Sequence, residues 1–285
     1  MNKLKNNFSK DGFKIVKGVL SSSEIDEIRE VVGAQEPGTR LMQPPKLNKL
    51  PHVLNVFVNK RVDSHLQEIL GDFYRFSSHQ LQINSFTQAT LQKASSGAHI
   101  DGIKELELNL SYMSESIPAW VNIGIYLQDY DNDGFGGGIA VLENSHKVVR
   151  LLARLPCSSV FIKSFIKVTK FLPFKYFKEV KTEPGDAIIF DNRLIHTSIP
   201  TKSTLKNENA SHQQFVSSIP NKNRKLAFYW FAGKTELNAE ILSNNFYSRV
   251  NRAADKTKTG GFDYKLACEL DNEFKGDIRK MLGAK

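Results

Sequence analysis

The alternation of apolar and polar positions divides the chain into a β-rich centre and helical segments at both ends. Between about residues 73 and 232, short apolar runs are broken by turn residues, as at 120–127, 187–190 and 226–231. Runs of this length bounded by turns are typical of strands. Many such strands in succession favour a β-sandwich or a barrel.

An N-terminal helical flank, residues 1–72, precedes this centre. The Phe-Lys-Ile-Val run at 13–16 predicts a short strand. Ser21 and Glu24 then have the spacing of a capping box, which marks the start of a helix. The apolar stripe of that helix is Ile25, Ile28, Val31 and Val32.

The C-terminal part, residues 233–285, is predicted to be helical again. Four apolar residues recur there at intervals of four, as on one buried helix face: Leu266, Leu270, Phe274 and Ile278. Residues 201–223 are polar without apolar periodicity, which predicts a mobile loop. No Pro-, Gly- or Ser-rich stretch divides the chain, so we expect one domain over 1–285 with its core at 73–232.

Composition indicates an ordinary globular protein, with 40% hydrophobic residues over 285 positions. The basic N-terminus lacks the apolar run of a signal peptide, and no apolar stretch approaches the roughly 20 residues of a membrane span. We therefore expect a cytoplasmic protein. Its two cysteines, Cys157 and Cys268, are far apart and predict neither a disulfide framework nor a thiolate metal site.

The formal net charge of +9 is concentrated in residues 147–181, which hold nine basic residues and a single acid, Glu179. Within this segment Lys163, Lys167 and Lys170 share one helical face, and Pro156 and Pro173 bracket the predicted helix. Apolar residues occupy the remainder of the helix: Phe161, Phe165, Val168 and Leu172.

Two interpretations of 147–181 remain open. In one, the helix packs its apolar side on the core and leaves its lysines in water. In the other, it is a basic amphipathic element that makes a peripheral contact with the anionic inner face of the membrane or guides an anionic, lipid-linked substrate. Nucleic acid is not expected as a partner, because no recognised binding module accompanies the charge. The oligomeric state is left open.

A candidate metal site comes from His99, Asp101 and His196. The first two form a His-x-Asp pair, and alternate residues of a strand project to the same face. The third follows the apolar run at 187–190. Two imidazoles and one carboxylate on one side of a metal are the facial triad of non-haem iron oxygenases, which leaves the opposite positions open.

At this point the sequence resembles the phytanoyl-CoA dioxygenase (PhyH-like) family over most of its length. Residues 11–20 look like that family's opening strand, and 185–196 look like its distal-histidine segment. Residues 138–147 are similar to its glycine-to-Ser-His-Lys turn, with Asn144 where glycine is usual. The resemblance implies a double-stranded β-helix, the jelly-roll or cupin-like barrel, with iron inside its open end and a lid over 147–181. It also implies that His146 is structural.

The same resemblance suggests residues that bind the co-substrate 2-oxoglutarate. A family arginine that follows the distal histidine binds the far carboxylate, and Arg224 fits it, although the polar loop makes its distance from the histidine unusually long. Arg193 is the rival. Ser198 resembles the hydroxyl that shares this carboxylate. Gln82 lies where relatives place a polar contact, but it could equally be a solvent-facing strand residue.

The implied chemistry uses Fe(II), 2-oxoglutarate and O2 to hydroxylate an unactivated C–H bond of a small or lipid-linked, anionic substrate, with formation of succinate and CO2. Halogenating relatives lack the carboxylate ligand, and Asp101 is present here. Asn122 and Tyr126, on one face of their strand, are candidates for the pocket wall. Desaturation or ring closure, a non-catalytic jelly-roll binding protein and a zinc hydrolase on the same fold remain alternatives.

Overall fold

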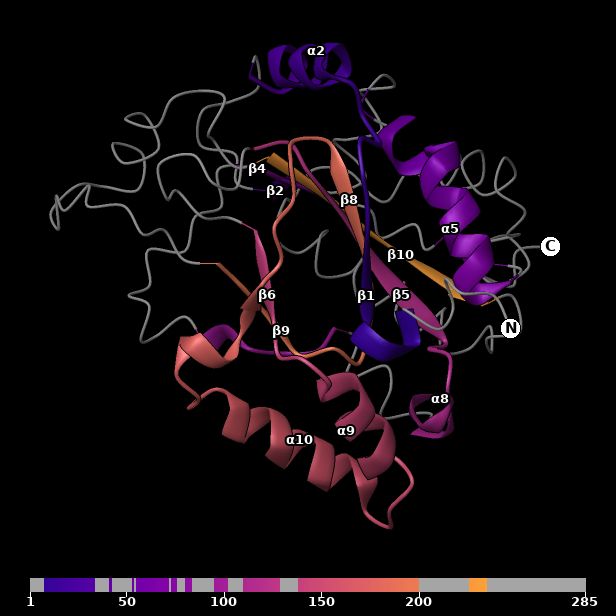
Figure 1. Cartoon of the computed structure of the whole chain (residues 1–285), viewed down its shortest axis with the longest axis vertical. Helices are drawn as coiled ribbons and strands as arrows, with labels where there is room; N and C mark the ends of the chain where they lie inside the picture. The colour runs from indigo at the N-terminus through magenta and orange to yellow at the C-terminus, as the bar shows by residue number, and fades with distance from the viewer. Residues whose placement is uncertain are drawn as a thin grey trace, which may run out of the picture.

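The computed structural model describes residues 8–33, 41–42, 53, 55–71, 73–75, 80–83, 95–101, 110–128, 138–199 and 226–234. The predicted loop at 201–223, Arg224 and the predicted C-terminal helices from 235 onwards lie outside these residues. The described part forms a mostly antiparallel jelly roll, a double-stranded β-helix of two sheets with helices around them (Figure 1).

Seven of the described strands form the larger sheet, in the order β1-β8-β5-β10-β4-β2, with β3 also paired to β10. The smaller sheet has the order β7-β6-β9. The strands of the larger sheet are β1 (Phe13–Val16), β2 (Leu41–Met42), β3 (Phe73–Arg75), β4 (Gln80–Ile83), β5 (Trp120–Tyr126), β8 (Asp186–Asp191) and β10 (Leu226–Lys234). Those of the smaller sheet are β6 (Ile139–Val141), β7 (Lys178–Glu179) and β9 (His196–Ser198).

The sheet extends beyond the core expected at 73–232. Strand β1 pairs with β8 in antiparallel register, Phe13 opposite Phe190, so the N-terminal flank contributes a strand. At the other end β10 continues two residues past 232, to Lys234. Both limits of the sheet are set by pairing with strands that are distant in the sequence, and local sequence patterns do not reveal such pairing.

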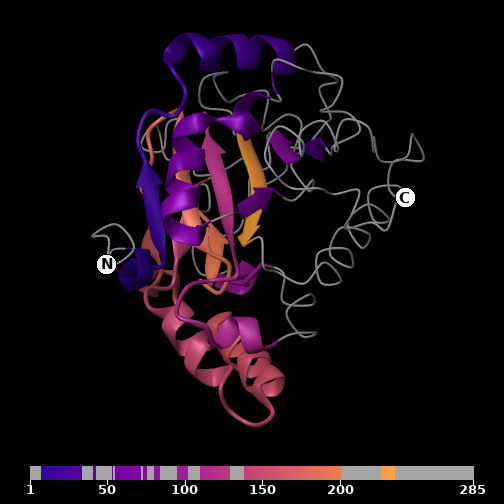
Figure 2. The same ribbon diagram turned by 90° about the vertical axis from the view of Figure 1, so that its right-hand side faces the viewer.

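The long apolar runs of the central strands follow from burial on both faces of the sheet. Every residue of β5 is buried. On one face Val121, Ile123 and Ile125 share a hydrophobic core with residues of the N-terminal helices. These are α2 (Ser22–Gly33) and α5 (Lys60–Leu70), and α5 lies along the sheet in Figure 2. The other face, with Tyr126, turns toward the smaller sheet.

Helix α2 begins as the capping box predicts. The Ser21 amide and hydroxyl both donate to Glu24 Oε2 at 2.7 Å, and the Glu24 amide donates back to Ser21 Oγ at 3.3 Å. Two backbone donors at the helix start are thereby satisfied.

Three more helices gather at the end of the molecule opposite α2 (Figure 1): α8 (Leu110–Ser114), α9 (Ser145–Leu152) and α10 (Ser158–Thr169). Asn144, just before α9, has φ 62°. Glycine adopts this left-handed conformation most readily, and asparagine tolerates it better than most other residues. Three short 3-10 turns complete the described elements: η1 (Asn55–Val58), η2 (Ser95–Gly97) and η3 (Phe174–Tyr176).

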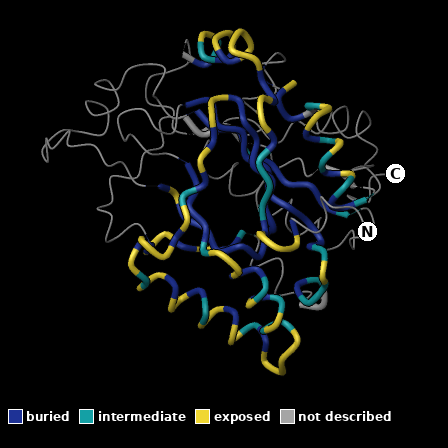
Figure 3. The backbone as a smooth tube through the Cα atoms, in the orientation of Figure 1, coloured by how far each residue is buried: buried dark blue, intermediate teal, exposed yellow. Residues whose placement is uncertain are grey.

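The predicted helix between Pro156 and Pro173 is α10, and it packs part of its apolar surface on the core while its lysines are exposed. Ile162, Ile166 and Thr169 are buried, whereas Phe161 and Val168 are exposed. Apolar residues occupy more of the helix surface than the core covers, so the sequence pattern alone could not select which of them are buried. Figure 3 shows the result as alternating buried and exposed positions along α10, in contrast to the central strands β5 and β8, which are wholly buried.

No helix among the described residues has the length and apolar character needed to cross a membrane.

Candidate metal centre

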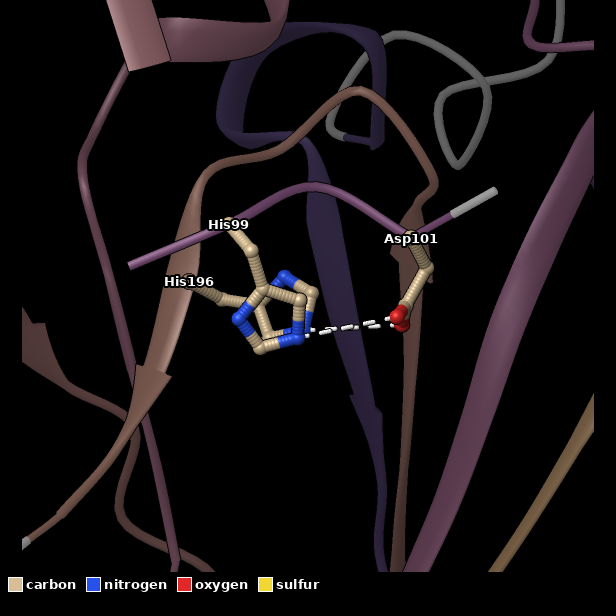
Figure 4. A group of neighbouring side chains, drawn as sticks. All are labelled: His99, Asp101 and His196. Carbon is tan, nitrogen blue, oxygen red and sulfur yellow. Dashed lines mark ion pairs between the residues drawn. The ribbon is translucent and has the colours of Figure 1, made fainter. Parts of the chain in front are cut away.

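A backbone bridge brings the two candidate histidines together. His99 and His196 form an antiparallel β-bridge in which each amide donates to the carbonyl oxygen of the other at 3.0 Å. His196 begins β9, and His99 follows η2. Because their backbones are paired, their side chains leave on the same side, and the ring centroids are 4.4 Å apart (Figure 4).

Each imidazole is oriented by a hydrogen bond from its second nitrogen. His99 Nδ1 lies 2.7 Å from the Gly97 carbonyl oxygen, and His196 Nδ1 lies 3.0 Å from that of Leu194. A carbonyl can only accept, so each Nδ1 carries a proton, and in the neutral form of such an imidazole Nε2 has the free lone pair. Orientation of this kind is typical of metal-ligating histidines.

Asp101 completes the group. Its Oδ1 lies 3.6 Å from His99 Nε2, and its Oδ2 lies 3.5 Å from His196 Nε2. One ligand atom from each residue lies within 4.8 Å of the other two. Figure 4 shows both rings directed at the carboxylate. The structure therefore brings together all three residues that the sequence suggested as ligands.

Asn122 holds the carboxylate from the inner face of β5. Its Nδ2 donates to Asp101 Oδ2 at 2.9 Å, and its side chain is buried. The Oδ1 of the same amide is buried without a hydrogen-bond partner in the described part of the chain. An unpaired acceptor at this depth is costly unless something donates to it, for instance a ligand in the site.

Burial sets the protonation of His196 and of two tyrosines near it. Burial of His196 and, to a lesser extent, the neighbouring His99 lower its pKa to about 4. The imidazole is therefore neutral at physiological pH, as a metal ligand must be. Burial also raises the pKa of Tyr126 and of Tyr229, which share a hydrogen bond, so both phenols keep their protons.

A cavity of about 210 Å³ adjoins the three residues. Asn122 and Tyr126 lie in its wall, as the shared strand face predicted, and Ser198 does too. None of the described residues in 147–181 lines it, so the lid remains a prediction. Further wall residues come from β5, β6 and the residue before it, β8, β9 and β10: Ile123, Gly138, Ile139, Phe190, Thr197, Tyr229, Trp230 and Phe231.

The candidates for binding 2-oxoglutarate are only partly described. The backbone of Gln82 lies in β4, where it pairs with Ala227 of β10. The structure does not describe the Gln82 side chain or any part of Arg224. The rival Arg193 is fully engaged elsewhere. Its guanidinium donates to both carboxylate oxygens of Asp191 at 2.9 and 2.7 Å and to two backbone carbonyls, and only 2% of the side chain is exposed.

Two contributions to the site escaped the sequence reasoning. The hydrogen bond from Asn122 to Asp101 joins residues on different segments, and no local pattern reports it. Tyr229 could have been proposed as a pocket residue, because it lies on the predicted strand at 226–231. Alternate residues of a strand share one face, so Tyr229 and Ala227 point to the same side of the sheet.

The donor set fits a divalent transition metal. Two neutral imidazole nitrogens and one carboxylate meet on one side of a cavity, so they would occupy one face of the ion and leave the opposite face to ligands in the cavity. His99, Asp101 and His196 are the residues that would hold it.

By sequence, the chain matches no model of a known protein family and no curated protein. Several solved structures share its fold. HygX from Streptomyces hygroscopicus, with nickel and 2-oxoglutarate bound, is 15% identical with a TM-score of 0.51, over 83% of this chain and 87% of HygX. The iron-bound form of HygX is 16% identical with a TM-score of 0.52, over 83% of this chain and 88% of HygX. EctD from S. alaskensis with bound Fe is 12% identical with a TM-score of 0.50, over 82% of this chain and 76% of EctD.

Proposed function

We propose that this chain is an iron(II)- and 2-oxoglutarate-dependent dioxygenase of the PhyH-like kind. It hydroxylates an unactivated C–H bond of a small or lipid-linked, anionic substrate and forms succinate and CO2. The observation that carries the proposal is the convergence of two oriented Nε2 atoms and one carboxylate on a cavity inside the jelly roll. The site would operate in the cytoplasm.

The protein's own groups have separable tasks in this reaction. His99, Asp101 and His196 hold the ion on one face, and the carbonyls of Gly97 and Leu194 keep the imidazoles in the ligating tautomer. When bound, iron and 2-oxoglutarate together supply the oxidising chemistry with O2. The apolar wall formed by Ile139, Phe190 and their neighbours excludes water from the substrate's reacting carbon.

Co-substrate binding is assigned to Arg224, with Ser198 and Gln82 as further polar contacts. A guanidinium suits a carboxylate because two parallel charge-assisted hydrogen bonds form in one plane. Ser198 lies in the cavity wall two residues beyond His196, on the same strand. The saturated hydrogen bonding of Arg193 supports the choice of Arg224 over its rival.

The solved structures with this fold support the proposal through what they hold. HygX was crystallised with 2-oxoglutarate and nickel and with iron, and EctD with iron. Since one fold hosts many reactions, the choice of hydroxylation over desaturation or ring closure rests on the resemblance to the PhyH-like family.

The first experiment measures substrate-stimulated succinate formation with Fe(II), across small metabolites, anionic lipids and glycolipid precursors. His99→Ala, Asp101→Ala and His196→Ala should each abolish iron-dependent turnover while the fold persists, because two remaining ligands leave a labile site. The control is His65→Ala, on α5 and outside the cavity wall, which should retain turnover. Full iron-dependent activity in any of the three variants would remove that residue from the site.

Binding can be tested apart from turnover. Under anaerobic conditions, adding 2-oxoglutarate to the Fe(II)-loaded protein should produce a weak visible charge-transfer band. Turnover with zinc and without 2-oxoglutarate would instead indicate a hydrolase. A band without turnover on any substrate would favour the binding protein.

The arginine assignment has its own test. Arg224→Ala should raise the 2-oxoglutarate requirement tens-fold or more, because losing a desolvated charged hydrogen bond costs about 2–5 kcal/mol. Iron binding should change far less. If Arg193→Ala shows this effect at unchanged stability and Arg224→Ala does not, the assignment is wrong.

A further inference from the structure

The exposed large apolar side chains of the described residues all lie between positions 148 and 176, on and around α9 and α10. Phe171 is 81% exposed, and Leu151 and Val168 are each 61% exposed. Scattered exposed apolar residues are normal on a protein surface, whereas a cluster marks an interaction site. We call the following residues the α9–α10 face: Leu151, Leu155, Val160, Phe161, Val168 and Phe171.

The geometry of α10 places the last four of these residues, Val160, Phe161, Val168 and Phe171, on and just beyond its outer side. Its inner side packs Ile162 and Ile166 into the same hydrophobic core as Trp120 of β5. Phe161 and Val168 are seven residues apart and thus nearly aligned after two turns. Phe171 follows just past the helix end, where its amide donates to the Val168 carbonyl at 3.0 Å.

Lysines flank this apolar surface. Lys163 and Lys167 are exposed on α10, and Lys170 is exposed at its C-cap. The whole segment 147–181 carries nine basic residues and one acid, Glu179. The outer side of α10 therefore combines apolar side chains with positive charge, the composition of helices that lie in a membrane interface.

We infer that the α9–α10 face docks the protein on an anionic lipid bilayer, with Phe161, Val168 and Phe171 entering the headgroup boundary and the lysines meeting the lipid phosphates. Both helices lie at one end of the molecule, away from α2 and α5, so the face can approach a flat surface (Figures 1 and 2).

Two other occupants fit this face less well. A second copy of the chain in a two-fold dimer would set the same surface against itself and bring like charges together. Nucleic acid would use the lysines, but five of the eight exposed apolar residues are Val or Leu, which cannot stack on bases as aromatic rings do. An anionic bilayer uses both the lysines and the aliphatic side chains.

The test is co-sedimentation of the full-length protein with vesicles of phosphatidylcholine alone or mixed with phosphatidylserine. Binding should be confined to the mixed vesicles and should weaken as salt is added. Lys167→Gln with Lys170→Gln should weaken it on the order of 20- to 30-fold, because each lysine near an anionic surface contributes about a five-fold factor. The matched control is Lys10→Gln with Lys60→Gln, which removes the same charge from exposed positions elsewhere.

Insertion of apolar groups needs its own variant and probe. Phe171→Ser should weaken binding roughly ten-fold, since a phenylalanine would be withdrawn from the interface. An environment-sensitive fluorophore on Cys157, which is exposed at the start of α10, should shift to the blue on mixed vesicles when Cys268→Ser leaves it as the sole thiol.

Equal losses in the two lysine pairs would overturn the inference, because only net charge would then matter. Equal binding to both vesicle types, or to neither, would overturn it as well. So would a stable dimer at low salt that Phe171→Ser dissociates, or binding to nucleic acid in place of vesicles. None of these assays uses iron or turnover, so the inference stands or fails separately from the proposed reaction.

Discussion

The hydrogen bond from Asn122 to Asp101 should control metal affinity without contributing a ligand. Asn122→Ala deletes the donor that lies 2.9 Å from Asp101 Oδ2 and frees a carboxylate that must face two imidazoles at once. A hydrogen bond to a charged group contributes about 1.5–3 kcal/mol. Loss of an outer-shell partner commonly lowers metal affinity about 10- to 100-fold, which agrees with that energy.

The assay is anaerobic equilibrium binding of Fe(II), or of Co(II) as a coloured substitute, to both proteins. Asn192→Ala is a matched control, because Asn192 is equally buried but absent from the cavity wall. We expect Asn122→Ala to bind at least ten-fold more weakly and Asn192→Ala to bind like the unaltered protein. Unchanged affinity in Asn122→Ala, or equal losses in both, would refute the idea that this amide positions the ligand.

Three further predictions concern stability. Gly12→Ala should lower the free energy of unfolding by roughly 2–4 kcal/mol, since φ is +78° and the new Cβ would lie 2.6 Å from His146 Nδ1. Gly18→Ala, with φ +57° and only an ordinary contact of 3.8 Å to Arg61 Nη1, should cost only about 1–2 kcal/mol, and similar values for the two variants in urea titrations would contradict the clash. Burial lowers the pKa of His146, so the folded state takes up fewer protons than the unfolded state, and the free energy of unfolding should fall as the pH drops below about 6.5, by at most about 1.4 kcal/mol per pH unit. His146→Gln should flatten that slope, and identical slopes in the two proteins would contradict this role of His146. Arg193→Met should lower stability by about 3–5 kcal/mol because it leaves Asp191 buried without its partner, and a thermal shift within experimental error would show that the pair is dispensable.

Sequence reasoning reached the parts of the structure that depend on short patterns. The strand at Phe13–Val16 and the capping box of Ser21 and Glu24 are confirmed, since a capping box needs only residues three apart. The sequence also suggested the group of His99, Asp101 and His196, although His99 lies in an isolated β-bridge and Asp101 in a turn, and not in the regular strand that the argument from alternation assumed.

Long-range packing set the limits of that reasoning. Nothing near Arg193 in the sequence says that two backbone carbonyls, those of Met113 and Glu115, complete its hydrogen bonds. In the same way, the exposure of Phe161 and Val168 depends on which part of the apolar surface of α10 meets the core, and the position of the lysine face does not determine this.

The backbone bridge between His99 and His196 has a consequence for the unfolded chain. The bridge closes a loop of roughly 100 residues. An ion held by both imidazoles would act as a reversible cross-link between the two ends of that loop. A permanent cross-link over such a length lowers the conformational entropy of the unfolded chain, which stabilises the folded state by about 4–5 kcal/mol. Ligand binding that favours the folded state raises its stability by mass action. Metal content and melting temperature should therefore change together, and protein that has lost its ion should be recognisable by its lower Tm before any turnover is measured.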